Sequence, residues 1–205
     1  MKYKFIEIGS CDFNTQVNSL LSDNEYGICV DPLKCYLDNL PNQKNLIKEN
    51  SIISNVNGVS DFFYIEPETI DRYRFPEWFK GCNSVHKPHP TIVNILLKHS
   101  IDSSIISVSR INSITYEDLV IKHQANDIDY LKIDIEGHEP VVIDSLCDFY
   151  AKDQKDFHPP SLINFEAFVG LLVSKEDIDL SIDKLKSIGY KFSHTIDSDI
   201  YMVFS

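Results

Sequence analysis

Short apolar runs alternate with helix-like segments along most of this chain, and this alternation limits the possible folds more than any other feature. It predicts a mostly parallel sheet that is covered by helices. The apolar run at 26–31 lacks polar alternation, as expected for a strand that is buried on both faces. We expect strands at 4–8, 26–31, 45–48, 105–111, 128–137, 161–168, 190–194 and 200–204. We expect helices at 14–21, 32–41, 91–99, 116–123 and 140–151, and one that Ser174 and Asp177 begin and Gly189 closes.

Two segments are predicted to form hairpins. Asn57-Gly58 lies between apolar runs in 52–65, which is a hairpin signal. The last two strands are joined by the short turn "TIDSD", so we expect them to pair at the edge of the sheet. By contrast, prolines interrupt residues 66–90, and we expect this segment to be an irregular lid over the acceptor pocket.

Chain length, net charge and cysteine spacing restrict the classes of protein to which this chain can belong. A chain of 205 residues suits one domain, which we expect to span 1–205. The formal charge of -12 opposes binding to a nucleic acid backbone. Five cysteines without a Cys-x-x-Cys spacing predict free thiols in a reducing compartment. No membrane span or signal peptide is evident, so we expect a cytoplasmic protein that does not bind membranes.

The first strand and the second strand both end at residues that suit a nucleoside cofactor. The first ends in Glu7-Ile8-Gly9, and Asp31 closes the second strand 24 positions after Glu7. A carboxylate at about this spacing is the usual acceptor for the ribose hydroxyls of a cofactor. The pair therefore predicts a cofactor site at the carboxyl ends of these strands.

The first loop presents side chains where a dinucleotide site would present glycines. Ser10, Asp12, Asn14 and Thr15 follow the single Gly9. A pyrophosphate needs closely packed backbone amides, so NAD is disfavoured. Acceptor groups suit the ammonium and sulfonium of S-adenosylmethionine. The alternative is that Asp12 and Asn14 only cap the first helix.

The segment "LKIDIEGHEP" carries the third set of candidate residues. Lys132, Asp134 and Glu136 alternate with apolar residues, so three charges are expected on one face of a buried strand. Buried charges are costly unless they are paired or functional. The alternative is an ion pair of Lys132 with Asp134 or Glu136 that is structural only. Glu139 is explained by the favourable position of an acid in a first helical turn.

Three segments together resemble one family. "FIEIGSCDFNT", "GICVDP" and "YLKIDIEGHEPVVIDSL", in this order, look like the FkbM-type family of S-adenosylmethionine-dependent methyltransferases. The resemblance implies a Rossmann-like α/β fold with a seven-stranded sheet of order 3-2-1-4-5-7-6, strand 7 antiparallel. It also implies methyl transfer, usually to an oxygen. We therefore expect O-methylation of a small molecule, sugar or glycan.

The resemblance assigns roles to individual positions. It implies that the methionine end of the cofactor is lined by Glu7, Gly9 and Asp12, the ribose is bound by Asp31, adenine is flanked by Pro32, Asn50 and Ser51, and the reaction centre is bordered by Asp134 and Glu136. We also expect Ser10 and Phe13 of the first loop to bind the cofactor. Phe13 departs from the pattern, because it stands where the family commonly has a second glycine. This departure admits an alternative function, a non-catalytic binding or scaffold module that keeps the fold.

The acceptor end of the site follows from the chemistry of the transfer. An alcohol must lose its proton, so we expect a base, first Asp134, then Glu136 or His138. The residues expected to contact the acceptor are Trp78, Asn83, His86, His89 and Glu166. Asp134 and Glu166 would suit a divalent cation as a minor alternative, and His86 with His89 suggests zinc, but no Cys-His pattern completes that site. We assign no metal ligand. No motif fixes the identity of the acceptor or the oligomeric state.

Overall fold

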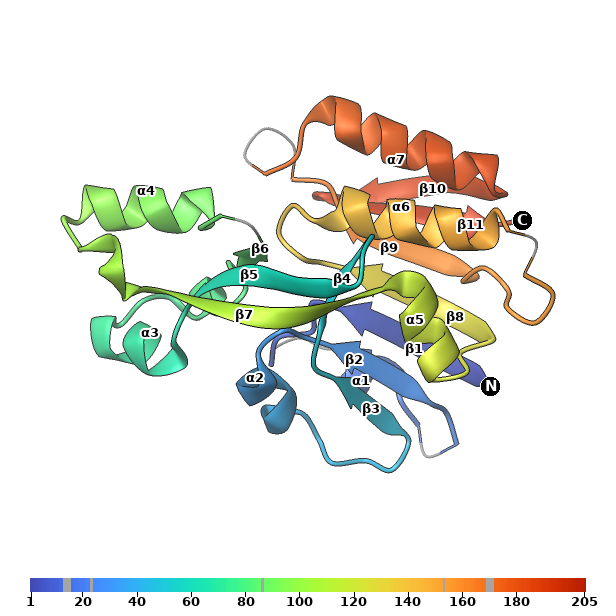
Figure 1. Ribbon diagram of the computed structural model, residues 1–205, viewed down its shortest axis with the longest axis horizontal. Coiled ribbons are helices and arrows are strands. Elements are labelled where there is room, and N and C mark those ends of the chain that lie inside the picture. The colour runs from blue at the N-terminus through green and yellow to red at the C-terminus, as the bar shows by residue number, and fades with distance from the viewer. Residues whose placement is uncertain (13–15, 23, 86, 153, 169–171) are drawn as a thin grey trace.

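The chain has an α/β fold with a large, mostly parallel sheet and helices on both of its faces, as the computed structural model shows (Figure 1). The structure describes residues 1–12, 16–22, 24–85, 87–152, 154–168 and 172–205. The large sheet has the strand order β10-β11-β9-β8-β1-β2-β3. Its strands are β1 (Lys2–Ile8), β2 (Gly27–Val30), β3 (Leu46–Glu49), β8 (Asp127–Ile133), β9 (Leu162–Glu166), β10 (Tyr190–Ile196) and β11 (Asp199–Phe204).

Strand direction changes at one edge of this sheet. The pairs from β3 to β9 are parallel, whereas β11 is antiparallel to both β9 and β10. If only the strands of this sheet are numbered along the chain, the order reads 3-2-1-4-5-7-6. The predicted hairpin of the last two strands is confirmed, and β10 is the edge strand.

A second sheet was not predicted, so the strand count of the described chain is eleven and not seven. It has the order β4-β7-β5-β6. Its strands are β4 (Ile52–Ser54), β5 (Gly58–Ile65), β6 (Ser84–Val85) and β7 (Ile106–Thr115).

The predicted hairpin in residues 52–65 is wrong. β4 pairs with β7 in parallel and β5 pairs with β7 antiparallel, so β7 lies between the two expected partners. Gly58 lacks the positive φ that a type I′ turn requires. The Asn57 side chain instead accepts a hydrogen bond from Thr115 N and donates one to Asp118.

The segment 66–90 is mostly regular, contrary to the prediction of an irregular lid. It contains α3 (Pro67–Tyr73), the 3-10 helix η1 (Glu77–Lys80) and β6, and α4 (Pro90–Lys98) begins at its end. Pro67 and Pro90 begin helices, because a first helical turn needs no amide proton from these residues. These elements extend to one side of the large sheet together with β5 and β7 (Figure 1).

The remaining helices follow the predicted pattern closely. Thr115 accepts a hydrogen bond from Asp118 N at the start of α5, and Ser174 accepts one from Asp177 N at the start of α7, where a cap was predicted. Asn14, considered above as a cap of the first helix, and Thr15 lie outside the described residues. The bounds are α1 (Gln16–Leu20), α2 (Lys34–Asn39), η2 (Ser103–Ile105), α5 (Tyr116–Lys122), α6 (Glu139–Tyr150) and α7 (Lys175–Ser187).

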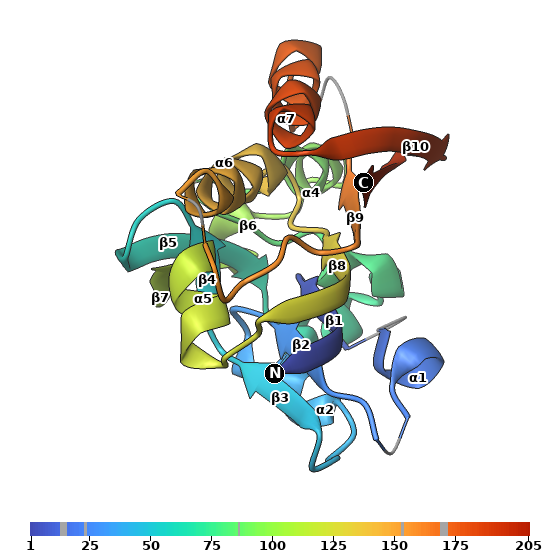
Figure 2. The same cartoon turned by 90° about the vertical axis from the view of Figure 1, so that its right-hand side faces the viewer.

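Two apolar clusters hold helices to the two faces of the large sheet. On one face, residues of α5, α6 and α7 pack with Ile6, Ile8 and Ile133. On the other face, Val17 of α1 and residues of α2 pack with Phe5. Figure 2 shows α5 and α6 on one side of β1 and β8, with α1 on the other. The helices therefore leave the carboxyl ends of the central strands available for a site.

Two further predictions concern cysteines and membranes. The five cysteines are free thiols, as predicted. Within the described ranges, no helix has the length and apolar character needed to cross a bilayer.

Candidate active site

A cavity of about 370 Å³ lies at the carboxyl ends of the central strands. β1 lies between β2 and β8, so the order in which the chain adds strands to the sheet reverses at β1. α/β proteins bind ligands at such a switch point. Predicted cofactor residues that line the cavity are Glu7, Gly9, Ser10, Asp31, Pro32 and Ser51. Predicted catalytic or acceptor residues that line it are Trp78, Asn83, Asp134, Glu136, His138 and Glu166.

Three predicted residues that the structure describes do not line the cavity. Asp12, Asn50 and His89 are not part of the cavity wall. Phe13 and His86 lie outside the described residues. The cavity therefore brings together predicted residues from the ends of β1, β2, β8 and β9.

Gly9 is required by the close approach of β1 to β8. Its φ is +87°, and a Cβ atom there would lie 1.8 Å from the backbone oxygen of Asp134. Its amide donates to Val30 O at 2.9 Å, so the same residue also holds the loop against β2. Only glycine fits this position.

Asp31 is buried at the end of β2, with 5% of its surface exposed. Cys11 N and Leu33 N each donate a hydrogen bond of 2.8 Å to its carboxylate. Burial raises the pKa of Asp31 to about 6, although the two backbone donors oppose this shift. Each carboxylate oxygen keeps a lone pair for a further donor such as a hydroxyl.

Two serine hydroxyls near Asp31 are buried without a hydrogen-bond partner among the described residues. Ser10 Oγ and Ser51 Oγ both belong to side chains that line the cavity and are 2% exposed. Buried polar groups of this kind are normally satisfied, so they point to a ligand. The side-chain amide of Asn50 donates to Asp31 O and Pro32 O and so holds the loop that follows β2.

Asp12 is held by two neighbours away from the cavity. Its carboxylate accepts from Asn39 Nδ2 at 2.7 Å and lies 3.4 Å from Lys80 Nζ. Lys80 does line the cavity and brings a positive charge to it from η1. Sequence reasoning missed Lys80, because no motif surrounds it and its segment was expected to be irregular.

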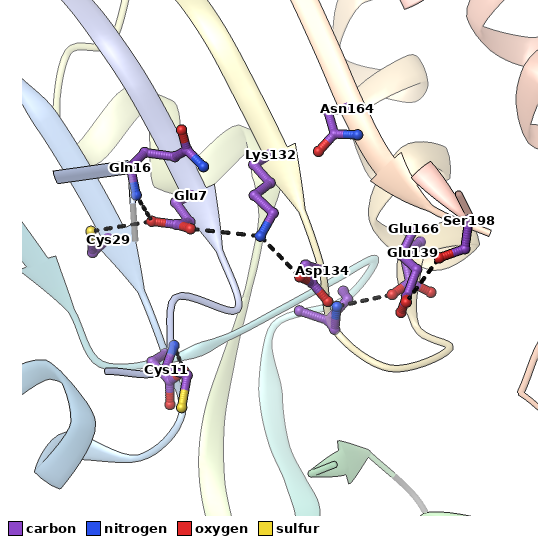
Figure 3. Close-up of polar contacts among 12 residues, drawn as sticks. Glu7, Cys11, Gln16, Cys29, Lys132, Asp134, Glu139, Asn164, Glu166 and Ser198 are labelled. Carbon is purple, nitrogen blue, oxygen red and sulfur yellow. Dashed lines mark hydrogen bonds and ion pairs between the residues drawn. The ribbon is translucent and has the colours of Figure 1, made fainter. Parts of the chain in front are cut away.

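A chain of charges runs along the ends of β1 and β8 (Figure 3). Lys132 Nζ lies 2.9 Å from Asp134 Oδ2 and 3.8 Å from Glu7 Oε1. Glu7 is 1% exposed, and Gln16 N donates to it at 2.8 Å. Burial raises the pKa of Glu7 to about 7, while the Gln16 amide and Lys132 oppose the shift. The ion pair of Lys132 with Asp134, foreseen as an alternative, is therefore present and lies in the wall of the cavity.

Glu136 does not lie on a strand, contrary to the prediction. β8 ends at Ile133, and Glu136 has a φ of +55° in the following loop. The buried carboxylate of Glu139 accepts hydrogen bonds of 2.9 Å from Ile135 N and Gly137 N. Glu139 thus holds this loop in its left-handed conformation, a role that its helical position alone did not indicate. Burial raises the pKa of Glu139 to about 8.

His89, a predicted acceptor contact, is not part of the cavity wall and holds Glu136, which is. The ring is 4% exposed, and Thr91 N donates to its Nδ1 at 3.2 Å. A backbone N–H can only donate, so Nδ1 accepts this hydrogen bond and carries no proton. We infer that the ring carries its proton on Nε2, which lies 3.0 Å from Glu136 Oε2. Cys82 Sγ lies within 4.8 Å of both groups, but a metal at Nε2 would have to displace this proton.

Three carboxylates that line the cavity lie close together. Oxygens of Asp134, Glu136 and Glu166 lie within 4.8 Å of one another. Burial and then the charges of Asp134 and Glu136 raise the pKa of Glu166 to about 7. Such a cluster suits a positively charged or hydrogen-bond-donating ligand, and we assign no metal ligand to it.

The other predicted catalytic or acceptor residues that line the cavity are His138, Trp78 and Asn83. His138 is buried, and its Nε2 lies 3.3 Å from Ser54 Oγ. Trp78 is 46% exposed at the wall of the cavity. Asn83 donates to Lys80 O, while its buried Oδ1 has no partner in the part of the chain that the structure describes.

Comparison with known proteins yields one family. The family model of the methyltransferase FkbM domain matches residues 35–192 of the 205 residues. The matched range includes the loop of Asp134 and Glu139, whereas β1 and β2 precede it. No curated protein matches the chain.

Proposed function

The chain belongs to the FkbM methyltransferase family, and from this premise we propose that it transfers the methyl group of S-adenosylmethionine to a hydroxyl of a small molecule or carbohydrate. The observation that supports the cofactor is the pair of buried hydroxyls of Ser10 and Ser51 beside Asp31, for which the described residues offer no hydrogen-bond partner. A nucleoside supplies the hydroxyls and ring nitrogens that would satisfy these three groups. Residues 1–205 are proposed to form one methyltransferase domain.

The nucleoside end of the cofactor is proposed to lie over β2. Asp31 would accept hydrogen bonds from the ribose hydroxyls, while Pro32 and Ser51 would flank adenine. Asn50 would act through the backbone, since its amide fixes the carbonyl groups of Asp31 and Pro32. Two charge-assisted hydrogen bonds to one carboxylate give both affinity and orientation.

The methionine end is proposed to lie over the Gly9 loop. Glu7 offers a carboxylate to the ammonium group of the cofactor, and Lys80 offers a positive charge to its carboxylate. Asp12 would act indirectly, because it holds the Lys80 ammonium at 3.4 Å. These side chains would replace the glycine-rich turn that a pyrophosphate requires.

When bound, S-adenosylmethionine supplies a methyl group activated by a sulfonium. Transfer to oxygen is an in-line displacement, so much of the catalysis comes from holding the acceptor oxygen close and aligned. Trp78 would stack on the acceptor, and Asn83 Oδ1 would accept one of its hydroxyl protons. Asp134, Glu136 and His138 are proposed to border the reacting atoms.

The proposal is tested with S-adenosylmethionine tritiated in its methyl group and a panel of alcohols, methyl glycosides and primary amines. We expect label in a product of the alcohol or glycoside class, stable to mild alkali as an ether is. Asp134→Asn should keep the fold and reduce transfer more than cofactor affinity. Cofactor binding without transfer to any compound in the panel would favour the alternative of a binding module.

A further inference from the structure

The three carboxylates at the acceptor end differ in what already holds them. Asp134 Oδ2 is 2.9 Å from the ammonium nitrogen of Lys132, and Glu136 Oε2 is 3.0 Å from Nε2 of His89. Glu166, at the end of β9, has only the Ser198 hydroxyl at 3.4 Å as a hydrogen-bond partner among the described residues. Glu166 and Ser198 are drawn at the right of Figure 3. Within the described ranges, Glu166 is therefore the carboxylate of the three that no N–H donor contacts.

The groups that face Glu166 are mostly acids. They come from the loop after β8, from α6, from β11 and from the residues after η1, and they are Asp134, Glu136, Glu139, Asp199 and Cys82. Lys132 on β8 brings a positive charge to the same cavity, and it is already engaged by Asp134 and Glu7. Like charges oppose the ionised form of Glu166, and burial acts in the same direction. A positive charge introduced into the cavity would reverse this balance.

The geometry points to a coupling between the charge of the cofactor and the catalytic base, an inference that rests on the proposed function. We propose that Glu166 takes the proton of the acceptor hydroxyl, and that the sulfonium charge drives Glu166 into its ionised form before transfer. Asp134, paired with Lys132, and Glu136, hydrogen-bonded to His89, orient the acceptor. After transfer the sulfur is neutral, so Glu166 keeps the proton until the products leave.

The step balances in atoms and electrons. The acceptor oxygen forms a bond to the methyl carbon, and the carbon–sulfur bond breaks with its electron pair remaining on sulfur. The O–H proton passes to a carboxylate oxygen of Glu166. The products are a methyl ether, S-adenosylhomocysteine and protonated Glu166, which later returns its proton to solvent. No oxidant, reductant or further reactant is needed.

The coupling can be measured without knowing the acceptor. Calorimetric titrations of S-adenosylmethionine and S-adenosylhomocysteine at pH 7, in PIPES and in imidazole buffer, give the number of protons exchanged on binding. Both ligands carry the same ribose, ammonium and carboxylate, so effects at Asp31 and Glu7 cancel in the comparison. Because the pKa of Glu166 is about 7, we expect the charged ligand to release about half a proton more than the neutral one.

Glu166→Gln should abolish this difference while both ligands still bind. Glu176→Gln is the matched control, since Glu176 is an exposed acid at the start of α7 and should leave the difference unchanged. Equal proton release by the two ligands in the natural protein would overturn the coupling, even if Glu166→Gln fails to fold. If the difference in proton release persists in Glu166→Gln, another group releases the proton and the role proposed for Glu166 is overturned. Absence of binding by either ligand would overturn the proposed function itself.

Discussion

Replacing Gly9 with alanine tests whether the close approach of β1 to β8 shapes the loop that we propose binds the cofactor. The new Cβ would lie 1.8 Å from Asp134 O and 2.8 Å from its carbonyl carbon, so two backbones must separate. The left-handed backbone adds roughly 1 kcal/mol for a residue with a Cβ, and overpacking adds roughly 1–3 kcal/mol. We expect Gly9→Ala to lower the free energy of unfolding by about 2–4 kcal/mol.

Gly58→Ala is the matched control for this change. Gly58 has no positive φ, and the nearest atom to its added Cβ is Ser113 Oγ at 4.0 Å. The free energy of unfolding, from urea titrations followed by circular dichroism, should change by less than about 0.5 kcal/mol. Gly9→Ala should also lose affinity for S-adenosylmethionine, whereas Gly58→Ala should bind it normally. Equal destabilisation by the two substitutions would refute the steric argument.

Three further changes test other parts of the site. Asp31→Ala should weaken binding of S-adenosylmethionine by roughly 1–3 kcal/mol in calorimetry, and unchanged affinity would mean that the ribose lies elsewhere. Glu139→Ala should destabilise the protein in urea by about 2–4 kcal/mol, because Ile135 N and Gly137 N lose their buried acceptor. Burial raises the pKa of Glu7 from 4.5 to about 7, so its contribution to stability is present below pH 4.5 and is lost as the pH rises through 7. Urea titrations of Glu7→Gln should therefore show a smaller loss of stability from pH 5 to pH 7 than those of the natural protein, and identical slopes would contradict this origin.

The sequence indicated the strand-end positions of the site because they depend on local pattern. Asp31 and Asp134 each follow an apolar run, and the carboxyl ends of parallel strands meet at one edge of a sheet. The helix caps Thr115 and Ser174 were likewise predictable from neighbouring residues. These features need only short-range information and the α/β pattern.

Long-range contacts were not predictable in this way. The contact of His89 with Glu136 depends on how the second sheet sits beside the first, and no local pattern encodes it. The position of Lys80 likewise follows from the 3-10 helix η1. The prolines around this helix predicted an irregular segment, so the helix was not expected. The hairpin prediction at Asn57 was wrong because its side chain accepts a hydrogen bond from Thr115 N at the start of α5 instead of forming a turn.

The most direct test of the central claim is a calorimetric titration of S-adenosylmethionine into the natural protein and into Asp31→Ala, with circular dichroism to verify the fold of both. The account predicts saturable binding to the natural protein and a clear loss of affinity in the variant. A folded natural protein that gives no heat of binding would contradict the assignment of the cavity to this cofactor.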